Sequence, residues 1–557
     1  MDTSAKFLID SLLEEGIDTY FGVPGGPAGP LFDAVLRTKG VVLVESKHET
    51  AALFEAIGYY KSTGRVPGVL VSAGPGITNC LTGLASAKAL QVPLLLFTGE
   101  VAWDKKNHIL LQAGGPEGLD LETTFKPHTD KVIRLKEPEL VCQEVINYLN
   151  GRSNRAPGLI IFPLHVGNVQ IEKPTIFSSV HQTTEFHVSK EIISDILDLL
   201  EQSERPLLVL GNGCRKDAPL VSSLVHFLNV PFVTTPQGKG VVNEKEYLSL
   251  GHSGLGASQW IRKYVEKTPD VVLVLGTDLD DCAIGTTELI GPNTKLIHID
   301  INPRVFNRKY QTHIAIVSDI KSFVTDLLST RYYESYGKRE LLDEVKAISA
   351  FDVPHFREDT SMPIAPHRAL ADLENAMPDA RFVTDIGEHM LFCLHYLTTS
   401  SNRKFSIDLG LGSMGSGICQ SIGMCFADRL PTICVCGDGG MQMHGMEVLT
   451  AVKHKLPIVF AIFNDARYNM VYHGFKFLFG RIENLGETEP IDFVKLFSAM
   501  GVPGYTITSP GEINSSMIES FFKNGPAILD IRINKDIRIK GAGRNEALKH
   551  MGEFDNG

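Results

Sequence analysis

Two apolar runs in the last third of the chain constrain its fold most strongly. Residues 432–435 lead into a Gly-Asp-Gly-Gly turn that contains Asp438, and residues 457–463 lead directly into Asn464-Asp465. The stretch between them, residues 446–454, has the apolar pattern of a helix. Two strands joined by a helical crossover run parallel, so their carboxyl ends meet at one edge of a sheet. The sequence therefore predicts that both aspartates lie at that edge.

The residue types at this edge suit a metal ion. Carboxylate oxygens are ligands that Mg²⁺ and Ca²⁺ prefer. Gly439 and Gly440 let the backbone approach a bound group closely. The aspartates therefore indicate a site at which Mg²⁺ holds a diphosphate. The alternative is that Gly-Asp-Gly-Gly is only the turn between a strand and a helix.

Strand and helix patterns alternate along the whole chain. This alternation favours an α/β fold of three doubly wound domains with mostly parallel sheets. In the first block, strand-like runs lie at residues 19–23, 41–44, 68–71 and 93–97. Polar or charged stretches separate the three blocks, near residues 177–190 and 331–344. We therefore expect domains at residues 1–165, 190–330 and 360–534, and a polar tail at residues 535–557.

Composition excludes several classes of protein. A formal net charge of −12 over 557 residues gives no basic surface, so a nucleic-acid partner is not expected. No apolar run reaches about 18 residues, and the N-terminus lacks the apolar core of a signal peptide, so neither a membrane span nor export is expected. Nine cysteines without a Cys-x-x-Cys pair fit a reducing compartment. We therefore expect a cytoplasmic globular protein.

The pair of motifs Gly437-Asp438-Gly439 and Asn464-Asp465 resembles the metal–diphosphate motif of thiamine diphosphate (ThDP) enzymes. In that family, Gly-Asp-Gly is followed, after a βαβ crossing, by two asparagines. The resemblance implies that ThDP and Mg²⁺ bind here, and that Asp438, the Asp465 side chain and the backbone carbonyl of Arg467 ligate the metal. Asp465 replaces the second asparagine. Its additional charge would either tighten metal binding or repel the diphosphate.

Glu49 occupies the position of the family's activating glutamate, in the similar context His48-Glu49-Thr50-Ala51-Ala52. The resemblance implies that its carboxyl shares a proton with N1′ of the cofactor's pyrimidine, which leads to loss of the C2 proton of the thiazolium. A buried carboxyl with a raised pKa would suit that role. The alternative is an acid that stabilises the first turn of a helix.

Two glycine turns flank Glu49 and resemble turns of acetolactate synthases. One contains Pro24-Gly25-Gly26, and the other is Gly74-Pro75-Gly76-Ile77-Thr78-Asn79. Each turn alone is weak evidence, because Gly-Pro turns are common. Their order around Glu49 is a stronger signal. The resemblance implies cofactor contacts from Pro24, Gly25, Pro75 and Asn79.

Two loops of the third block resemble cofactor-contacting loops of the family. In residues 410–417, Met414 is the candidate for the apolar side chain that bends the cofactor, and the Gly412 carbonyl would accept from its amino group. The alternative for Met414 is a core methionine. Gly387, Glu388 and His389 match a diphosphate-contacting loop in which related synthases carry Gly-Gln-His. Glu388 departs from that pattern, because it stands where the related synthases carry glutamine. An acid is unfavourable beside a diphosphate, so only backbone contacts are expected from this residue.

Three residues are expected on the substrate side. Met470 matches the methionine of a Gly-Met-Val stretch in acetolactate synthases, and the resemblance places it near the reacting carbon. His473 is a candidate to face the substrate, with a structural histidine as the alternative. Gln112 lies in a Leu-Gln-Ala-Gly stretch that also occurs in benzaldehyde lyase. Its amide would bond a substrate oxygen, or it is a glutamine of a surface loop.

The resemblance implies a carboligase that takes a 2-keto acid such as pyruvate, removes CO₂ and joins the remainder to a carbonyl acceptor. The paired histidines of pyruvate-type decarboxylases are missing, which favours carboligation. A ThDP-dependent lyase or decarboxylase is the alternative, and a non-catalytic binding protein of this fold is another. A nucleotide-binding oxidoreductase is disfavoured, because no Gly-x-Gly-x-x-Gly fingerprint follows Gly211-Asn212-Gly213.

The second block resembles the central domain of acetolactate synthases, many of which hold FAD there. The arginine expected near residues 276–281 is missing, and Gly254-Leu255-Gly256-Ala257 replaces a Gly-Met-His-Gly element. We therefore expect no FAD. The family builds its site between two chains, with Glu49 of one chain facing Asp438 of the other. The resemblance thus implies self-association, as a homodimer or a dimer of dimers.

Overall fold

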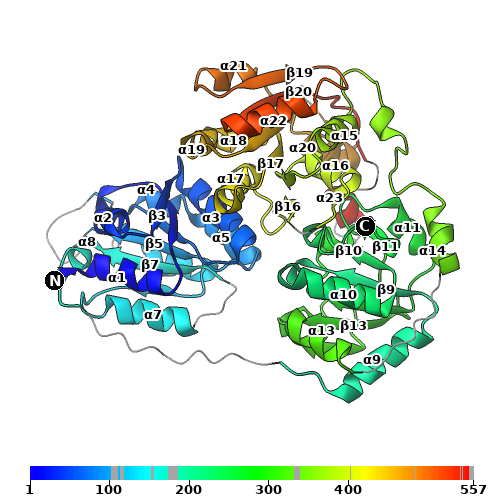
Figure 1. Ribbon diagram of the computed structural model, residues 1–557, viewed down its shortest axis with the longest axis horizontal. Coiled ribbons are helices and arrows are strands. Elements are labelled where there is room, and N and C mark those ends of the chain that lie inside the picture. The colour runs from blue at the N-terminus through cyan, green and yellow to red at the C-terminus, as the bar shows by residue number, and fades with distance from the viewer. Residues whose placement is uncertain are drawn as a thin grey trace.

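The computed structural model describes residues 1–101, 111–112, 118–151, 156–173, 186–330, 339–401, 403–482, 485–539, 541 and 543–550. Three six-stranded sheets dominate it (Figure 1), and neighbouring strands pair parallel throughout each of them. A short antiparallel pair, β1 (Asp2–Thr3) and β8 (Gln170–Ile171), lies outside these sheets. The expected α/β fold with three mostly parallel sheets is confirmed.

The N-terminal sheet has the order β3-β2-β4-β5-β7-β6. Its strands are β2 (Thr19–Gly22), β3 (Val42–Glu45), β4 (Gly68–Val71), β5 (Leu95–Glu100), β6 (Val132–Arg134) and β7 (Gly158–Pro163). Its helices are α1 (Ser4–Glu14), α2 (Gly29–Arg37), α3 (Glu49–Thr63), α4 (Pro75–Thr78), α5 (Leu81–Ala89), α6 (Leu121–Phe125), α7 (Val141–Gly151) and α8 (Leu164–Gly167).

The central sheet has the order β11-β10-β9-β12-β13-β14. Its strands are β9 (Pro206–Leu210), β10 (Phe232–Thr234), β11 (Ser249–His252), β12 (Val271–Leu275), β13 (Lys295–Asp300) and β14 (Ile314–Val317). Its helices are α9 (Lys190–Gln202), α10 (Ala218–Leu228), α11 (Gln259–Tyr264), α12 (Asp281–Ile284), α13 (Ile320–Leu328) and α14 (Arg339–Lys346).

The C-terminal sheet has the order β16-β15-β17-β18-β20-β19. Its strands are β15 (Arg381–Thr384), β16 (Phe405–Ile407), β17 (Thr432–Gly437), β18 (Ile458–Asn464), β19 (Gly504–Ile507) and β20 (Ala527–Arg532). Its helices are α15 (Pro366–Ala376), α16 (Glu388–Tyr396), α17 (Ser416–Asp428), α18 (Asp438–His444), α19 (Val448–Lys453), α20 (Asn469–Phe479), α21 (Phe493–Ser498), α22 (Ser515–Asn524) and α23 (Arg544–His550).

Each sheet separates two apolar layers, which explains why its strands are nearly continuous apolar runs. On β4, Leu70 joins one core of the N-terminal unit, while Val69 and Val71 join the other. The same alternation on β17 sends Ile433 and Cys434 to opposite cores. A strand that is covered on both faces is buried at every position, as all residues of β18 are. The strand signals of the sequence are therefore the signature of buried parallel sheets.

The N-terminal and C-terminal units pack through α3 and α17, which lie side by side (Figure 1). Glycines allow the two helix backbones to touch. A Cβ on Gly58 of α3 would meet the backbone of Gln420 on α17, and a Cβ on Gly423 would meet the backbone of Glu55. The middle of α3, the helix that begins at Glu49, therefore packs directly against the C-terminal unit.

One expectation about local structure needs correction. The Gly-Asp-Gly-Gly stretch is not a turn, because a helix, α18, begins at Asp438 itself. Glycines lower helix propensity, and here burial and packing override them. The helix expected at residues 446–454 corresponds to α19. In the polar tail, α23 packs against α12 and α20. The polar stretch at residues 177–190 lies mostly outside the described residues.

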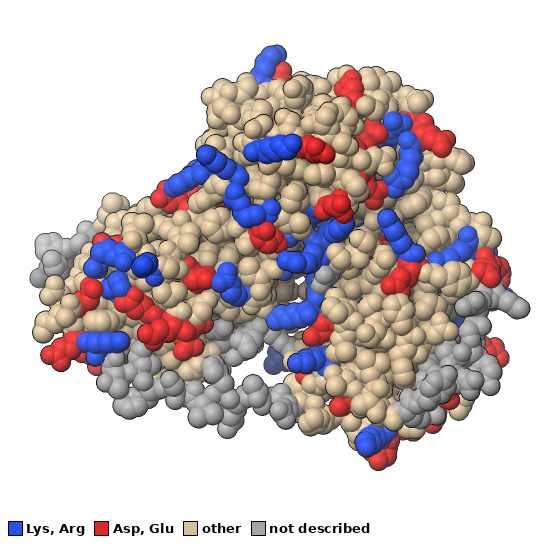
Figure 2. All heavy atoms as spheres, in the orientation of Figure 1, with Lys and Arg blue, Asp and Glu red and all other residues tan. Residues whose placement is uncertain are grey.

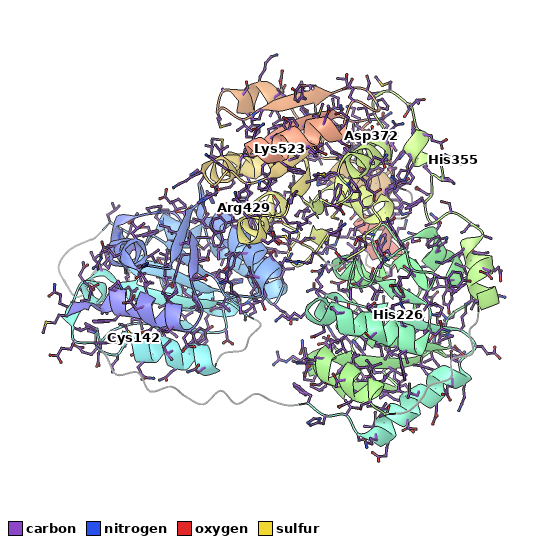
Figure 3. The ribbon with its side chains drawn as sticks, in the orientation of Figure 1. Cys142, His226, His355, Asp372, Arg429 and Lys523 are labelled. Atoms are coloured by element: carbon purple, nitrogen blue, oxygen red, sulfur yellow. The ribbon has the colours of Figure 1, made fainter. Side chains whose placement is uncertain are left out.

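The nine cysteines are all free and buried. Cys142 on α7, for example, packs in a core of the N-terminal unit (Figure 3). No helix among the described residues is long and apolar enough to cross a membrane. On the face shown in Figure 2, acidic and basic side chains are interspersed, and several basic side chains follow one another down the middle of the view.

Candidate active site

The predicted residues of the N-terminal unit gather at the carboxyl ends of its strands. Glu49 is the first residue of α3, directly after the loop that follows β3. Its Oε2 accepts a hydrogen bond from Asn79 Nδ2 at 3.0 Å. A Cβ on Gly76 would lie 3.6 Å from Glu49 Oε1. The Gly-Pro-Gly turn thus lies against the glutamate, as the order of the motifs predicted.

Two further loops close around this turn. Gly25 packs on Ser72 at the end of β4, because a Cβ on Gly25 would lie 2.5 Å from Ser72 Oγ. Gln112 has a φ of 61° and packs on Gly74, where a Cβ would lie 2.8 Å from Gln112 Cγ. Gln112 is therefore half-buried against the second glycine turn rather than free in a surface loop. Residues 102–110 and 113–117 lie outside the described residues.

The predicted metal ligands lie at the carboxyl ends of β17 and β18, which are neighbours in the C-terminal sheet. Asp438 is 4% exposed, and its Oδ1 accepts from the backbone N–H of Gly439 at 2.9 Å. Asp465 Oδ1 accepts from the N–H of Arg467 at 3.2 Å, and Asn469 Nδ2 donates to Asp465 Oδ2. The structure therefore brings both carboxylates to one edge of the sheet.

The electrostatics of this edge fit a cation. Burial raises the pKa of Asp438 to about 6. Burial and, second, the charge of Asp438 raise the pKa of Asp465 to about 8. Asp438 is buried and Asp465 is partly buried, and two such carboxylates that repel one another are stabilised by a divalent ion between them. The donor set therefore fits Mg²⁺, as the sequence indicated.

Arg467 contributes both its backbone and its charge to this edge, because its charge opposes the rise in the pKa of Asp465. Its guanidinium donates to the carbonyl of Lys535 and lies 3.9 Å from the centre of the Tyr472 ring. Its carbonyl oxygen accepts from the N–H of Asn469 at 2.8 Å. A carbonyl has two lone pairs, so that oxygen keeps a second position for a metal.

The loop that carries Met414 lies over the glycines of α18. A Cβ on Gly439 would lie 2.9 Å from Met414 Cε and would clash with the Tyr468 ring. Asp385, directly after β15, holds the loop: its carboxylate accepts from the N–H groups of Gly415 at 2.8 Å and Gly417 at 2.9 Å. Sequence reasoning missed this role of Asp385, because its partners lie far along the chain.

The Gly387-Glu388-His389 turn lies at the same edge. His389 is 7% exposed, burial lowers its pKa to about 4, and its Nε2 has no hydrogen-bond partner among the described residues. A buried polar atom without a partner is expected where a polar ligand binds. Glycines also keep this ring uncovered, since a Cβ on Gly387 would lie 2.5 Å from His389 Cε1. The turn therefore fits a diphosphate.

Glu388 has a partner that the sequence did not predict. Its Oε1 lies 2.8 Å from Nδ1 of His473, and both side chains are nearly buried. Its Oε2 has no hydrogen-bond partner in the described part of the chain. His473 and Met470 lie one turn apart on α20, and Met470 packs against the adjacent core. Glu388, the acid of the expected diphosphate loop, therefore pairs with His473, the candidate substrate-side histidine.

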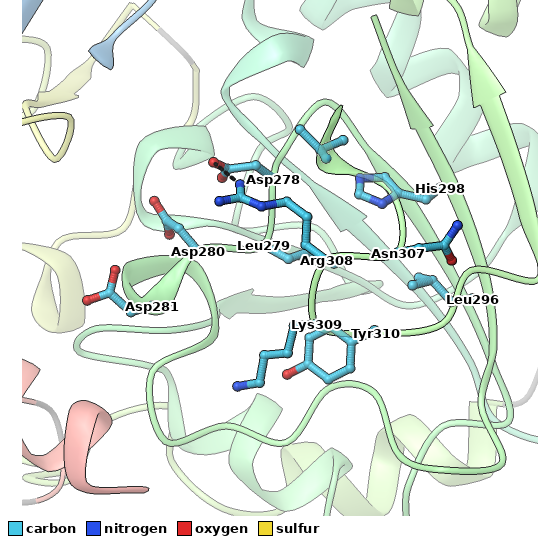
Figure 4. Close-up of a pocket in the computed structure, with 11 residues that line it drawn as sticks. Asp278, Leu279, Asp280, Asp281, Leu296, His298, Asn307, Arg308, Lys309 and Tyr310 are labelled. Carbon is cyan, nitrogen blue, oxygen red and sulfur yellow. Dashed lines mark ion pairs between the residues drawn. The ribbon is translucent and has the colours of Figure 1, made fainter. Parts of the chain in front are cut away.

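A separate cavity of about 390 Å³ lies in the central unit, at the carboxyl ends of β12 and β13 (Figure 4). Its charged lining includes Asp278, which pairs with Arg308 at 3.8 Å, together with Asp280 and Asp281. None of the predicted site residues lines it. Figure 4 shows the three aspartates along one side of the cavity.

Comparison with protein families agrees with this geometry. Models described as the N-terminal TPP binding domain, the central domain and the C-terminal TPP binding domain of thiamine pyrophosphate enzymes match residues 2–120, 193–327 and 385–531. The first two lie on the N-terminal and central sheets, and the third spans the edge that holds Asp438 and Asp465. The chain belongs to the thiamine pyrophosphate enzyme family and is a ThDP-dependent enzyme.

Comparison with individual proteins indicates which members of the family this chain resembles. The chain is 29% identical to the probable acetolactate synthase large subunit of Methanocaldococcus jannaschii, over 95% of this chain and 92% of that protein. It is 28% identical to the acetolactate synthase of Arthrospira platensis, over 96% and 94%. It is 26% identical to the acetolactate synthase isozyme 2 large subunit of Escherichia coli, over 98% and 99%. The enzyme is therefore acetolactate synthase-like along its whole length.

Proposed function

We propose that the protein is a ThDP- and Mg²⁺-dependent carboligase. It would take a 2-keto acid such as pyruvate as donor, release CO₂ and form a carbon–carbon bond with a carbonyl acceptor. The observation that carries the proposal is the pair of carboxylates at one sheet edge, of which Asp438 is buried and Asp465 is partly buried. The acetolactate synthase names of the relatives support the choice of substrates.

The cofactor would be held by the C-terminal unit. Asp438, Asp465 and the Arg467 carbonyl would ligate the metal, and the partnerless Nε2 of His389 would face the diphosphate, whose negative charge would favour the protonated ring that can donate to it. Gly439 and Gly440 would leave room for it, as would Gly387. When bound, ThDP supplies an electron sink for the bond that breaks next to the donor carbonyl.

The remaining residues would position and move protons. Glu49, held by Asn79, would keep a proton at N1′ of the pyrimidine. Met414, with the Gly412 carbonyl beside it, would fix the bent shape of the cofactor. Pro24, Gly25 and Pro75 would shape the pyrimidine side of the site.

On the substrate side, Met470 would pack against the donor. His473, oriented by Glu388, would exchange a proton with substrate. Gln112 would donate to a substrate oxygen from its place on Gly74. The match of Gln112 to a benzaldehyde lyase stretch favours an aldehyde or ketone as acceptor.

We also propose that no FAD is needed and that the chain associates with itself. The proposal on FAD rests on the missing arginine near residues 276–281 and on the altered element at residues 254–257, because Arg308 and Lys309 line the central cavity together with its three aspartates. In one chain α3 packs on α17, and the pairing of Glu49 with Asp438 of a second chain stays a prediction of the resemblance. A cytoplasmic location stays a prediction as well.

Product analysis tests the proposal. The enzyme is incubated with ThDP, Mg²⁺ and pyruvate, with and without an aldehyde, and products are separated by mass spectrometry. A carboligase gives a coupled hydroxyketone or hydroxy acid whose yield depends on the acceptor. Acetaldehyde and CO₂ alone would instead identify a decarboxylase. No turnover of any 2-keto acid, with ThDP bound, would favour a binding protein.

A further inference from the structure

The loop between β3 and α3 is held from outside by the C-terminal unit. Glu447 Oε1 accepts hydrogen bonds from the backbone N–H groups of Lys47 at 2.8 Å and His48 at 2.9 Å. Lys453 Nζ lies 2.8 Å from Glu45 Oε2 at the other end of the same loop. These contacts span about 400 residues of sequence. The residues directly before Glu49 are thus fixed by side chains of the other unit.

The Glu447 carboxylate is itself well anchored. Its residue is 1% exposed, and Thr450 Oγ1 donates to its second oxygen at 2.9 Å. Successive backbone N–H groups that converge on one oxygen form an anion-binding concavity. A buried carboxylate is tolerated only where such donors satisfy it. The loop and Glu447 therefore stabilise one another.

A second buried acid, Glu55, lies on α3, and its carboxyl group is next to that of Glu447. Glu55 is fully buried, and its Oε2 accepts from Ser46 Oγ at 2.5 Å. Its Oε1 has no hydrogen-bond partner among the described residues. Burial and, second, the charge of Glu447 raise the pKa of Glu55 well above its ordinary range. A proton on Glu55 would give that oxygen a hydrogen bond to Glu447, and the pair would then carry one charge.

We propose that Glu447 is a positioning residue for Glu49: it anchors the backbone of Lys47 and His48 and so fixes the first turn of α3. The proposal rests on the proposed function, because it takes Glu49 as the acid that activates the cofactor. Glu447 acts through the backbone and touches no substrate. Docking of the N-terminal unit on the C-terminal unit is thereby coupled to the placement of the activating carboxyl.

Amide hydrogen exchange of the cofactor-free protein tests the anchoring step. Glu447→Ala removes the acceptor, so the amides of Lys47 and His48 should exchange about tenfold faster or more. Glu447→Gln keeps an acceptor oxygen and should retain most of the protection. Unchanged exchange at both amides in a folded Glu447→Ala protein would overturn the proposal, whatever the role of Glu49.

Turnover tests the positioning step. A misplaced catalytic group costs about 10²-fold, so Glu447→Ala should lower kcat by about 10- to 100-fold. ThDP affinity and the KM of the donor should stay within about threefold, because their anchors lie on other loops. Glu49→Gln is the reference. If it leaves turnover intact, the proposed function is wrong. If Glu49→Gln abolishes turnover, and Glu447→Ala shows faster amide exchange at Lys47 and His48 but an unchanged kcat, only the positioning role of Glu447 is wrong.

Two further variants complete the test. Glu55→Gln replaces a protonated acid by its neutral isostere, so exchange and kcat should match the wild type; a loss as large as that of Glu447→Ala would contradict a neutral Glu55. Thr450→Val removes the hydroxyl that holds Glu447 Oε2 at 2.9 Å and that also lies 3.3 Å from the backbone carbonyl of Glu45. It should shift both readouts in the same direction by a smaller factor, even if Glu447→Ala does not fold. An unshifted Thr450→Val protein in that case would overturn the proposal.

Discussion

His473 Nδ1 lies 2.8 Å from Glu388 Oε1, which joins α20 to the first turn of α16 at the cofactor edge of the C-terminal sheet. A carboxylate on one ring nitrogen fixes the tautomer and leaves Nε2 for substrate. His473→Asn should therefore lower kcat for carboligation by about 10²- to 10⁴-fold, the usual contribution of an acid–base group.

Glu388→Gln is the matched variant, because its amide oxygen can still accept from the imidazole. It should cost about tenfold or less in kcat, and it restores the residue of related synthases. Steady-state kinetics with varied donor and acceptor measure both. Full activity in His473→Asn would show that the histidine is structural.

Asp465 makes the stability of the metal-free protein depend on pH. Its pKa in the folded protein is raised to about 8, above the value of about 4 expected for an unfolded chain. The stability it contributes is therefore fully present below about pH 4 and lost as pH rises through about 8. Melting temperatures of the metal-free protein should fall over that range, and Mg²⁺ with ThDP should reverse the fall.

Asp465→Asn should flatten this dependence and should also reduce the rise of Mg²⁺ affinity with pH, leaving the part that comes from Asp438, whose pKa is about 6. Asp379→Asn is the control, since Asp379 is 90% exposed and pairs only with Lys404 among the contacts described. Calorimetry across pH gives the affinities. Equal slopes for wild type and Asp465→Asn would mean that the additional charge is incidental.

Gly439 has no room for a side chain. A Cβ there would clash with Tyr468 and lie 2.9 Å from Met414 Cε, so Gly439→Ala should displace the Met414 loop and weaken ThDP binding by about tenfold or more. Gly29→Ala is the control, because a Cβ there meets nothing within 4 Å. ThDP titrations monitored by calorimetry compare the two. Wild-type affinity in Gly439→Ala would remove the loop from the cofactor site.

Gln112 is placed by its contact with Gly74. If its amide bonds substrate, Gln112→Ala should lower kcat/KM for carboligation by about 10-fold, which is about the effect of one lost hydrogen bond to substrate. ThDP affinity should not change. A fall in ThDP affinity without a kinetic effect at saturating cofactor would make Gln112 a cofactor contact instead.

Sequence patterns predicted the central features of the fold because buried parallel strands are continuous apolar runs. Thr432–Gly437 and Ile458–Asn464 follow that rule, and so do the first-block runs that became β2, β3, β4 and β5. The edge strands β6 and β16 were not predicted, since three residues are too few to show a period. β7 was also missed, although its six residues are buried inside the sheet. The helix at Asp438 was missed because two glycines disguise it.

The parts of the candidate site that lie in short sequence motifs could be predicted. The parts that depend on contacts between residues distant in the sequence could not. Glu49 and the Asp438–Asp465 pair lie in short motifs. Asp385 could not be assigned, because it acts on N–H groups about 30 residues away. Glu447 and the partnership of Glu388 with His473 depend on packing between distant helices, which no local pattern encodes.

Exchange of the C2 proton of bound ThDP tests the central claim most directly, because it needs no knowledge of the substrates. The cofactor-loaded enzyme is mixed with D₂O, quenched with acid and analysed by NMR. The wild-type protein should exchange this proton faster than free ThDP, and Glu49→Gln should lose about 10²-fold or more of that rate with ThDP still bound. A Glu49→Gln protein that exchanges the proton as fast as the wild type would contradict the account.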